Sequence, residues 1–364
     1  MKKERVLLGM SGGVDSSMSA WYLQEQGYEV VGITFNTVSP LASPGSRQFI
    51  LEVKALAAGL HIEHHLIDVY DAFKKEVIDY FVDEYLRGRT PNPCIRCNET
   101  IKWKLLLEES ERLKCDKIST GHYVNVVKKD GYFHILKGLD PAKDQSYFLW
   151  NLPQQTLSKC IFPLGSLHKK LIKEKAKELG FKSMANKKES MGVCFLHGQN
   201  YRSFIDEIKP DLRENLDNGE VLNSDGDKIG THEGFPYYTI GQKRGLNLLK
   251  NHGECVAQID AENNKLITAP KNSLFSDHLI ISDYLTNNPY FLNRTQKVDV
   301  RIRGLDCVPP TPGTVELIDN QLHIHFNEPV WALTPGQSIV IYQDNIVVGG
   351  GIVDDIQFNA HIES

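Results

Sequence analysis

The alternation of apolar and polar positions divides the chain into an N-terminal part that mixes strands with helices and a C-terminal part of short strands. Over the first 115 residues, apolar runs predict a buried strand at residues 6–8 and a second strand at residues 28–35, and a third strand is predicted at residues 62–69. Helical spacing predicts helices at residues 16–26, 47–58 and 72–86. Such alternation favours a parallel sheet covered by helices, with ligands bound at the carboxyl ends of the strands.

The pattern changes after about residue 199, where a helix at 201–208 is followed by strand-rich sequence. Turn signals at Ser224–Gly226 and Glu262–Asn264 predict hairpins. Short strands at 298–303, 314–317, 322–326, 338–342 and 346–353 predict a small closed β-barrel. The predicted fold is therefore α/β, with a parallel-sheet domain at residues 1–199, a small β-rich central domain at 200–275 and a C-terminal β-barrel at 276–364.

A glycine- and serine-rich loop joins the first predicted strand to the first predicted helix. Its glycines allow a close approach of the backbone, and the N–H groups at a helix N-terminus favour a phosphate. Neither a Walker lysine nor a Gly-x-Gly-x-x-Gly fingerprint is present. The candidate nucleotide-binding residues of this loop are Gly9, Met10, Ser11, Gly12, Gly13, Val14, Asp15 and Ser16.

Charge and composition add local rather than global information. The net charge of −5 does not indicate nucleic acid binding, but the predicted helix 168–179 and the residues after it are rich in lysine: Lys169, Lys170, Lys173, Lys175, Lys177, Lys182, Lys187 and Lys188. This excess is typical of contacts to an RNA backbone, and equally of a solvated helix face. No stretch approaches the length of a membrane span and no signal peptide is recognisable, so we expect a cytoplasmic protein with reduced cysteines.

Three cysteines stand in sequence contexts that bear on chemistry. Cys94 and Cys97 follow a proline-rich entry, and a helix predicted from about Asn98 places Cys97 near a helix N-terminus, with Arg96 close in sequence. Both features favour a thiolate, although Cys-x-x-Cys is also typical of a redox pair or half a zinc site. Cys194 lies within an apolar run, which by itself indicates a buried core cysteine.

The loop Gly9–Ser17 resembles the PP-loop of the ATP pyrophosphatases, enzymes that split ATP into AMP and pyrophosphate. Taken with further stretches in a specific order, nearly the whole chain resembles the bacterial tRNA-specific 2-thiouridylases. These stretches are residues 90–98, 120–123, 143–149, 162–165, 187–196, 238–245 and 334–338. Cys94 stands where some members of that family carry an aspartate.

The resemblance implies a PP-loop adenine-nucleotide hydrolase-like domain and an activity: adenylation of the C2 oxygen of the wobble uridine, then replacement of that oxygen by sulfur. It implies Cys194 as the persulfide carrier, and Cys97 as the nucleophile that closes a Cys97–Cys194 disulfide in each turnover. ATP with Mg²⁺, tRNA bound through its anticodon stem-loop, and a sulfur-relay donor protein are expected. Beyond the loop, the resemblance assigns Phe35 and Gly121 to ATP, Asn92, Pro93 and Cys94 to the target base, and His122, Lys143, Asp144, Gln145, Arg303, Gly304 and Gln337 to tRNA.

Three alternatives remain open at the level of sequence. Cys94, Cys97 and Cys194 could instead hold a [4Fe–4S] cluster that carries the sulfur. Another PP-loop enzyme, such as a synthetase that adenylates a small molecule, would need neither Cys194 nor tRNA. A protein without activity that binds RNA or an iron–sulfur cluster would retain the loop but release no pyrophosphate.

Overall fold

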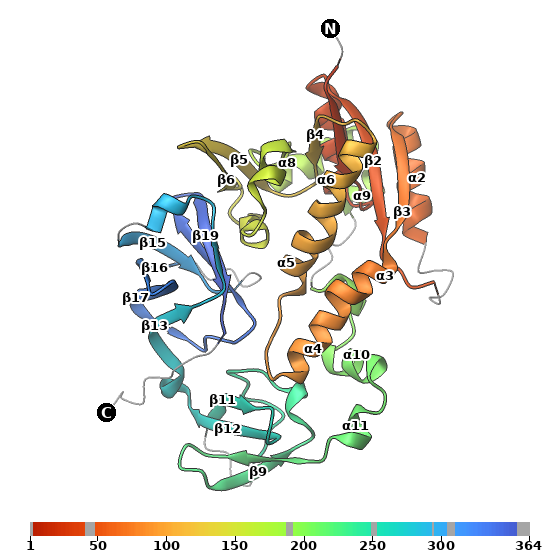
Figure 1. The fold of residues 1–364 in the computed structure, drawn as a ribbon. Helices are drawn as coiled ribbons and strands as arrows, with labels where there is room; N and C mark the ends of the chain where they lie inside the picture. Colours follow the sequence, from red (N-terminus) through yellow and green to blue (C-terminus); the bar gives the residue numbers. More distant parts are fainter. Residues whose placement is uncertain are drawn as a thin grey trace. The chain divides into compact units, whose positions relative to one another are not determined.

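The computed structural model describes residues 3–40, 48–186, 192–248, 253–292, 295–303 and 310–354. The chain folds into two compact units (Figure 1). The first takes residues 1–77, 94–190 and 345–348, and the second takes residues 78–93, 191–344 and 349–364.

A five-stranded parallel sheet organises the first unit, in the order β3-β2-β1-β4-β7. Its strands are β1 (Arg5–Gly9), β2 (Glu29–Asn36), β3 (Glu63–Asp68), β4 (Lys117–Ser119) and β7 (Cys160–Ile161). The three strands predicted at residues 6–8, 28–35 and 62–69 are therefore confirmed, although only β1 and β2 are largely buried. The parallel arrangement matches the fold class predicted for this part of the chain.

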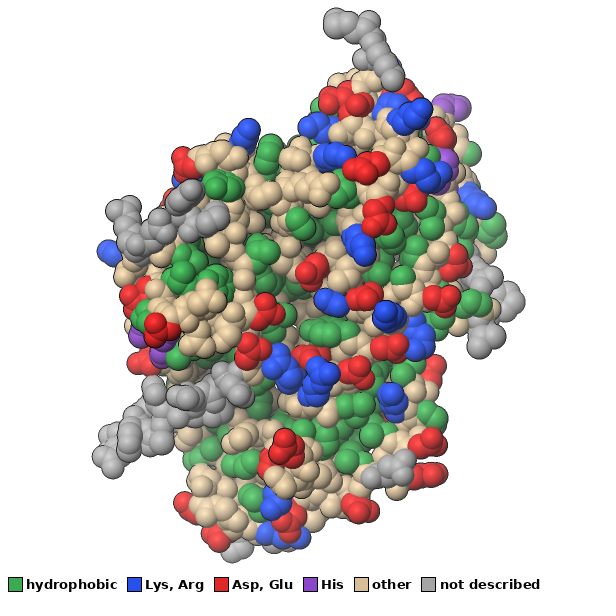
Figure 2. Space-filling model, viewed as in Figure 1, with side chains coloured by type: hydrophobic (Ala, Val, Ile, Leu, Met, Phe, Trp, Pro, Cys, Tyr) green, Lys and Arg blue, Asp and Glu red, His purple; other side chains and the backbone are tan. Residues whose placement is uncertain are grey.

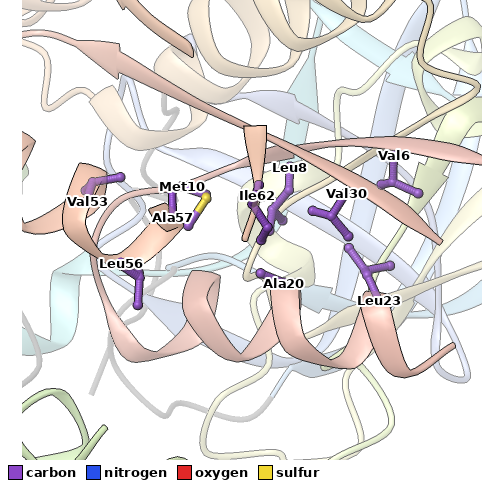
Figure 3. Close-up of a cluster of buried hydrophobic side chains, with 10 residues drawn as sticks. All are labelled: Val6, Leu8, Met10, Ala20, Leu23, Val30, Val53, Leu56, Ala57 and Ile62. Atoms are coloured by element: carbon purple, nitrogen blue, oxygen red, sulfur yellow. The ribbon is translucent and has the colours of Figure 1, made fainter. Parts of the chain in front are cut away.

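Alternate residues of β1 face opposite sides of the sheet, and both sides are covered by helices. Val6, Leu8 and Met10 lie in a buried cluster with residues of α1 (Val14–Glu25) and α2 (Gln48–Gly59), among them Leu23 and Val53 (Figure 3). On the other side, α6 (Trp103–Arg112) packs on β1 and β4. A strand buried on both faces reads as a continuous apolar run, as residues 6–8 do.

The strand order places a switch point between β1 and β4. From β1 the chain moves outward to β2 and then β3, and it returns on the other side of β1 as β4. The loops that leave the carboxyl ends of β1 and β4 therefore start at one place in the sheet, which is the usual ligand position in open α/β sheets. The two loops are residues 10–13 and 120–123.

Two helical runs depart from their predicted extents. The helix predicted at 72–86 spans α3 (Tyr70–Phe73), a π-helical segment at Lys74–Asp79 and α4 (Tyr80–Leu86). The helix predicted from about Asn98 begins earlier, as α5 (Pro93–Cys97), and continues through a π-helical segment at Asn98–Lys102 into α6. Pro93 therefore belongs to the helix rather than to the segment before it, because proline is favoured in the first turn of a helix, where its missing N–H needs no partner.

The rest of the first unit contains a hairpin and several helices. After β4 the chain continues as β5 (Val124–Lys129), which pairs with β6 (Tyr132–Lys137). Leu136 of β6 also pairs with Ile346. The helices are α7 (Gln154–Lys159), α8 (Lys169–Glu178) and α9 (Lys182–Asn186), with a 3₁₀ turn at Ser146–Leu149.

The second unit contains a five-stranded sheet in the order β10-β9-β8-β12-β11. Its strands are β8 (Gly219–Leu222), β9 (Lys228–His232), β10 (Asn247–Leu248), β11 (Glu254–Asp260) and β12 (Lys265–Pro270). The turns predicted at Gly226 and Asn264 join antiparallel pairs, β8 with β9 and β11 with β12, and are confirmed. Helices α10 (Tyr201–Ile208) and α11 (Leu212–Asn215) precede this sheet.

The C-terminal strands of the second unit form the predicted barrel. Their order is β13-β17-β16-β15-β18-β19, and β14 pairs with β19. Because β14 follows directly after β13 in the chain, its pairing with β19 links the two ends of this strand order through the chain. The strands are β13 (Phe275–Ile281), β14 (Tyr284–Thr286), β15 (Gln296–Arg301), β16 (Thr311–Ile318), β17 (Gln321–Trp331), β18 (Ser338–Gln343) and β19 (Ile346–Ile352).

The two compact units do not by themselves test the two predicted domain boundaries, after residues 199 and 275, which stay predictions. Among the described residues, no helix is both long enough and apolar enough to cross a membrane.

Candidate functional site: a nucleotide loop and two separate cysteine segments

The loop between β1 and α1 is held by hydrogen bonds from its own serines. The backbone N–H of Ser11 donates to Ser16 Oγ at 3.2 Å, and Ser16 Oγ donates to the carbonyl of Gly13 at 3.1 Å. Gly12 has a φ of +76°, and a Cβ at this position would lie 2.8 Å from Val53 Cγ2. The loop conformation therefore requires glycine at position 12.

The first turn of α1 is arranged to receive an anion. Gly13 occupies the N-cap position, and no side chain caps the helix there. The backbone N–H groups at a helix start carry partial positive charge, which favours a phosphate group at this position. Two further candidate nucleotide residues lie near the carboxyl ends of β1 and β2. The N–H of Met10 donates to the carbonyl of Ile33, which extends the pairing of the two strands, and Phe35 is half-buried near the end of β2.

Gly121 lies directly against this turn, as the strand order requires. A Cβ on Gly121 would lie 2.8 Å from the backbone nitrogen of Ser16 and 2.9 Å from the carbonyl carbon of Asp15. The structure thus brings together the predicted nucleotide residues of β1, α1 and the β4 loop, which are separated by more than a hundred positions in the sequence.

Replacing Gly121 with alanine is expected to displace the first turn of α1, because the added methyl group meets backbone rather than a mobile side chain. We expect a loss of about 1–3 kcal/mol in the free energy of unfolding and a KM for ATP raised about tenfold. Gly59→Ala is the matched control, since a Cβ there meets nothing within 4 Å. Steady-state kinetics and urea denaturation of both variants check this, and an unchanged KM for Gly121→Ala would contradict the placement.

Two side chains of the first unit bind the carboxylate of Asp15. Tyr123 donates its hydroxyl to Asp15 Oδ1 at 2.7 Å. The ammonium of Lys169 lies 2.6 Å from Oδ1 and 2.7 Å from Oδ2. Lys169 is 6% exposed, so the interpretation of this residue as part of an RNA-facing lysine row is wrong.

The Lys143–Gln145 motif, assigned to tRNA by resemblance, makes hydrogen bonds within the first unit. Asp144 accepts from the backbone N–H groups of Gly138 and Ser146 and from the Ser146 hydroxyl. Gln145 Oε1 accepts from the N–H of Tyr123 at 3.0 Å, and the Gln145 N–H donates to the Tyr123 carbonyl at 3.3 Å. Two of the three motif residues therefore fix the loop beside Tyr123, and their contact with tRNA stays a prediction.

His122 is a poor candidate for a cationic contact. Burial, with the nearby charge of Lys102 adding to it, holds the pKa of His122 well below its usual range. Its Nδ1 lies 2.6 Å from the Thr120 hydroxyl, and its ring stacks with Trp103 at 6.1 Å between centroids. His122 is thus neutral at pH 7 and can act only as a hydrogen-bonding group.

The lowered histidine pKa predicts that the protein loses stability in mild acid. Below about pH 6.5 this histidine binds a proton in the unfolded chain but not in the folded protein. The free energy of unfolding therefore decreases as the pH decreases. The other described histidines with a lowered pKa act in the same direction: His64, His134, His232 and His278. Urea midpoints at pH 7.5 and 5.5 measure the effect, which His122→Gln should reduce. A midpoint that does not fall by pH 5.5 would contradict it.

The two clustered cysteines lie one helical turn apart on α5. Both Cys94 and Cys97 are half-buried. Because α5 begins at Pro93, Cys97 is its fifth residue rather than a residue at the start of a helix, and the field of the helix terminus falls off within the first turn. Arg96 forms an ion pair with Glu76 at 2.7 Å, so both reasons for a thiolate at Cys97 are weaker than the sequence indicates.

Cys194 belongs to the second unit and is exposed, so the interpretation as a buried core cysteine is wrong. It begins a 3₁₀ turn at Cys194–Leu196 in which Phe195 carries the packing. The Phe195 ring lies 5.2 Å from that of Phe81 on α4 and 5.1 Å from that of Phe204 on α10. The aromatic anchor holds the turn while the thiol-bearing residue next to it faces solvent.

The segment before the predicted base-binding residues is bound by loops of the second unit. Gln337 Nε2 donates to the carbonyl of Thr90 at 2.6 Å, and Thr90 N–H donates to the carbonyl of Pro335 at 2.8 Å. Arg303, also assigned to tRNA, donates to the carbonyl of Ala332 at 2.8 Å. The predicted tRNA residue Gly304 lies outside the described residues.

Fewer lysines of the predicted basic row face solvent than the sequence indicates. Lys175 pairs with Glu178 at 3.1 Å, whereas Lys170 and Lys177 are exposed. Lys187 and Lys188 lie outside the described residues. On the face drawn in Figure 2, basic and acidic side chains are interspersed rather than gathered by sign.

Comparison with known proteins assigns the chain to a family. Residues 4–198 match the family described as "tRNA methyl transferase HUP domain", residues 204–270 its "PRC-barrel domain", and residues 276–353 the "Aminomethyltransferase beta-barrel domain". A relative named tRNA-specific 2-thiouridylase MnmA 3, from Phocaeicola vulgatus, is 42% identical over 97% of this chain and 95% of its own length. Relatives named tRNA-specific 2-thiouridylase MnmA are 41% identical in Cytophaga hutchinsonii, over 96% of this chain and 97% of theirs, and 39% identical in Chlorobium luteolum, over 97% of both.

The domain descriptions mention methyl transfer, but they are labels of separate segments, whereas the relatives match from end to end. Their names agree on 2-thiouridylase, and each match covers at least 96% of this chain. The chain therefore belongs to the family of tRNA-specific 2-thiouridylases.

Proposed function

We propose that this protein replaces the C2 oxygen of the wobble uridine of tRNA by sulfur in an ATP-dependent reaction. The end-to-end match to 2-thiouridylases is the observation that carries this proposal. The nucleotide loop with its glycine-dependent geometry and the exposed Cys194 are the two features that such a reaction needs.

The first step activates a poor leaving group. The C2 oxygen of uridine attacks the α-phosphorus of ATP, the bond to the β-phosphate breaks, and pyrophosphate leaves. The N–H groups at the start of α1 and the serines of the loop would stabilise the negative charge that collects on pyrophosphate. We assign Gly9–Ser16, with Phe35 and Gly121, to this nucleotide site.

The second step delivers sulfur. A persulfide on Cys194, loaded by a sulfur-relay donor protein, attacks C2 through its terminal sulfur, and AMP departs with the original oxygen. The base is then joined to Cys194 through a disulfide. The thiolate of Cys97 attacks the Cys194 sulfur, releases 2-thiouridine, and leaves a Cys97–Cys194 disulfide that a two-electron reductant must open. The exposure of Cys194 supports this role, since a relay protein must reach it.

The target base must leave its stack before C2 can be reached. We assign Asn92, Pro93 and Cys94 to the flipped base. His122, Lys143, Asp144, Gln145, Arg303, Gly304 and Gln337 we assign to the anticodon stem-loop. Because tRNA and ATP are both cytoplasmic substrates, we place the reaction in the cytoplasm.

Magnesium accompanies ATP in such reactions and is usually bound by one or two carboxylates together with the phosphates. Asp15 is a carboxylate at the loop, but Lys169 and Tyr123 already bind its two oxygens, so the phosphates would supply most of the binding of the magnesium ion. The [4Fe–4S] alternative stays a prediction, and we derive no step through a cluster.

Two measurements on anaerobically purified protein test the proposal against this alternative. Iron and acid-labile sulfide are quantified, and thiolation of tRNA is assayed with ATP and a persulfide-loaded donor. We expect 2-thiouridine without stoichiometric iron. Activity that follows iron content would favour the cluster, and pyrophosphate release without any need for tRNA would favour an enzyme that adenylates a small molecule.

A further inference from the structure

Two side chains from separate elements converge on the carboxylate of Asp15 in the first turn of α1. Tyr123 precedes β5 and binds one oxygen, while Lys169, the first residue of α8, binds both. We propose that Lys169 is a positioning residue for ATP, which holds and neutralises Asp15 at the nucleotide loop and does not contact tRNA. This inference rests on the proposed function, because it takes the loop to be the ATP site.

The contacts leave Lys169 little freedom to act elsewhere. Its ammonium lies within 2.7 Å of both carboxylate oxygens, and 5.5 Å from the centre of the Tyr123 ring. The residue is 6% exposed, so its charge is shielded from solvent and from any ligand on the outer face of α8. A buried ammonium with a bidentate partner fixes the orientation of that partner.

Both the backbone hydrogen bond of Lys169 and its position on α8 direct its side chain toward the interior. Its N–H donates to Asp140 Oδ2 at 3.0 Å, which ties the start of α8 to the turn after β6. Ile172 and Ala176 follow three and seven residues later on the same face, and both are fully buried. Lys170 lies on the other side and is exposed.

The charge of Lys169 matters because ATP is strongly anionic. The start of α1 attracts phosphate through its N–H groups, whereas the carboxylate of Asp15, in the same turn, repels it. The ammonium of Lys169 cancels that repulsion and keeps the carboxylate turned toward Tyr123. Without the ammonium, the nucleotide loop would present an uncompensated negative charge to the triphosphate.

Binding of a non-hydrolysable ATP analogue and of tRNA, each measured separately on the full chain, tests the inference. We expect Lys169→Gln to weaken the analogue at least tenfold while tRNA affinity stays within twofold. Lys169→Arg, which keeps the charge, should recover most of the loss. The matched control Lys170→Gln, on the same helix, should leave affinity for the analogue within twofold.

The outcomes separate this inference from the proposed function. If wild-type protein binds the analogue and Lys169→Gln binds it equally well, the inference is wrong and the function stands. If Lys169→Gln loses tRNA rather than the analogue, Lys169 contacts RNA and the inference is also wrong. Failure of the wild type to bind the analogue would overturn both. Should Lys169→Gln not fold, Tyr123→Phe decides: it removes one hydrogen bond to Asp15 and is expected to weaken the analogue about threefold, and no change would overturn the inference.

Discussion

Replacement of Cys194 by serine is expected to abolish formation of 2-thiouridine, by at least about a thousandfold, because a hydroxyl cannot carry the transferable sulfur. Cys194 is exposed, and Phe195 rather than Cys194 packs the turn. The substitution should therefore change the free energy of unfolding by less than about 0.5 kcal/mol. Pyrophosphate release in the presence of tRNA and tRNA binding should stay within a few-fold of wild type. Quantification of nucleosides from digested tRNA gives the first readout.

Two further cysteine variants show whether the effect is specific. Cys97→Ser should stop the reaction one step later, with tRNA joined to Cys194 through a disulfide that an added thiol releases. Cys115→Ala removes a buried cysteine of the first unit and should keep thiolation. A Cys194→Ser protein that loses tRNA binding, or that still forms 2-thiouridine, would contradict the assignment of Cys194 as the sulfur carrier.

Replacement of Asp15 by alanine is expected to block formation of AMP and also to destabilise the first unit. The second effect does not follow from the sequence, which names Asp15 as a candidate nucleotide-binding residue but does not show its partners. In the structure the variant leaves the buried ammonium of Lys169 without its bidentate partner. Leaving a buried charge without its partner lowers the free energy of unfolding by about 3–5 kcal/mol. Because Asp15 is about one-third exposed, we expect a loss of about 1–3 kcal/mol here.

A matched variant separates the two effects of Asp15. Asp71 lies in the first turn of α3 and is exposed, so Asp71→Ala should alter neither AMP formation nor the urea midpoint. Asp15→Asn keeps the size of the side chain and should be less destabilising than alanine. Survival of AMP formation in Asp15→Ala would show that this carboxylate does not serve the nucleotide, whatever its effect on stability.

The sequence predicts elements better than it predicts which way their side chains face. Strands β1, β2 and β3 appear as expected, as do the loop before α1 and the barrel strands. Each of these follows from local periodicity or turn chemistry. Lys169 shows the limit. A lysine-rich segment suggests a solvated face, yet Lys169 stands three residues before Ile172 and seven before Ala176. Its position on the apolar face was a signal that its charge must be paired in the interior.

Pro93 and Cys194 show two other limits. Proline is compatible both with an extended segment and with the first turn of a helix. The residue at which α5 begins therefore depends on tertiary context, which the local sequence does not show. The run Val193–Leu196 is apolar throughout, but a turn of three residues can bury only one large side chain, which here is Phe195. A short apolar run does not reveal which of its members faces solvent.

The most direct test of the account is the product made from tRNA that lacks the modification. Purified protein is incubated with that tRNA, ATP, magnesium and a donor carrying labelled persulfide sulfur, and the nucleosides and AMP are quantified. We predict labelled 2-thiouridine at the wobble position, one AMP for each base modified, and no product when ATP is omitted. Pyrophosphate release with an unmodified or methylated tRNA product would contradict the central claim.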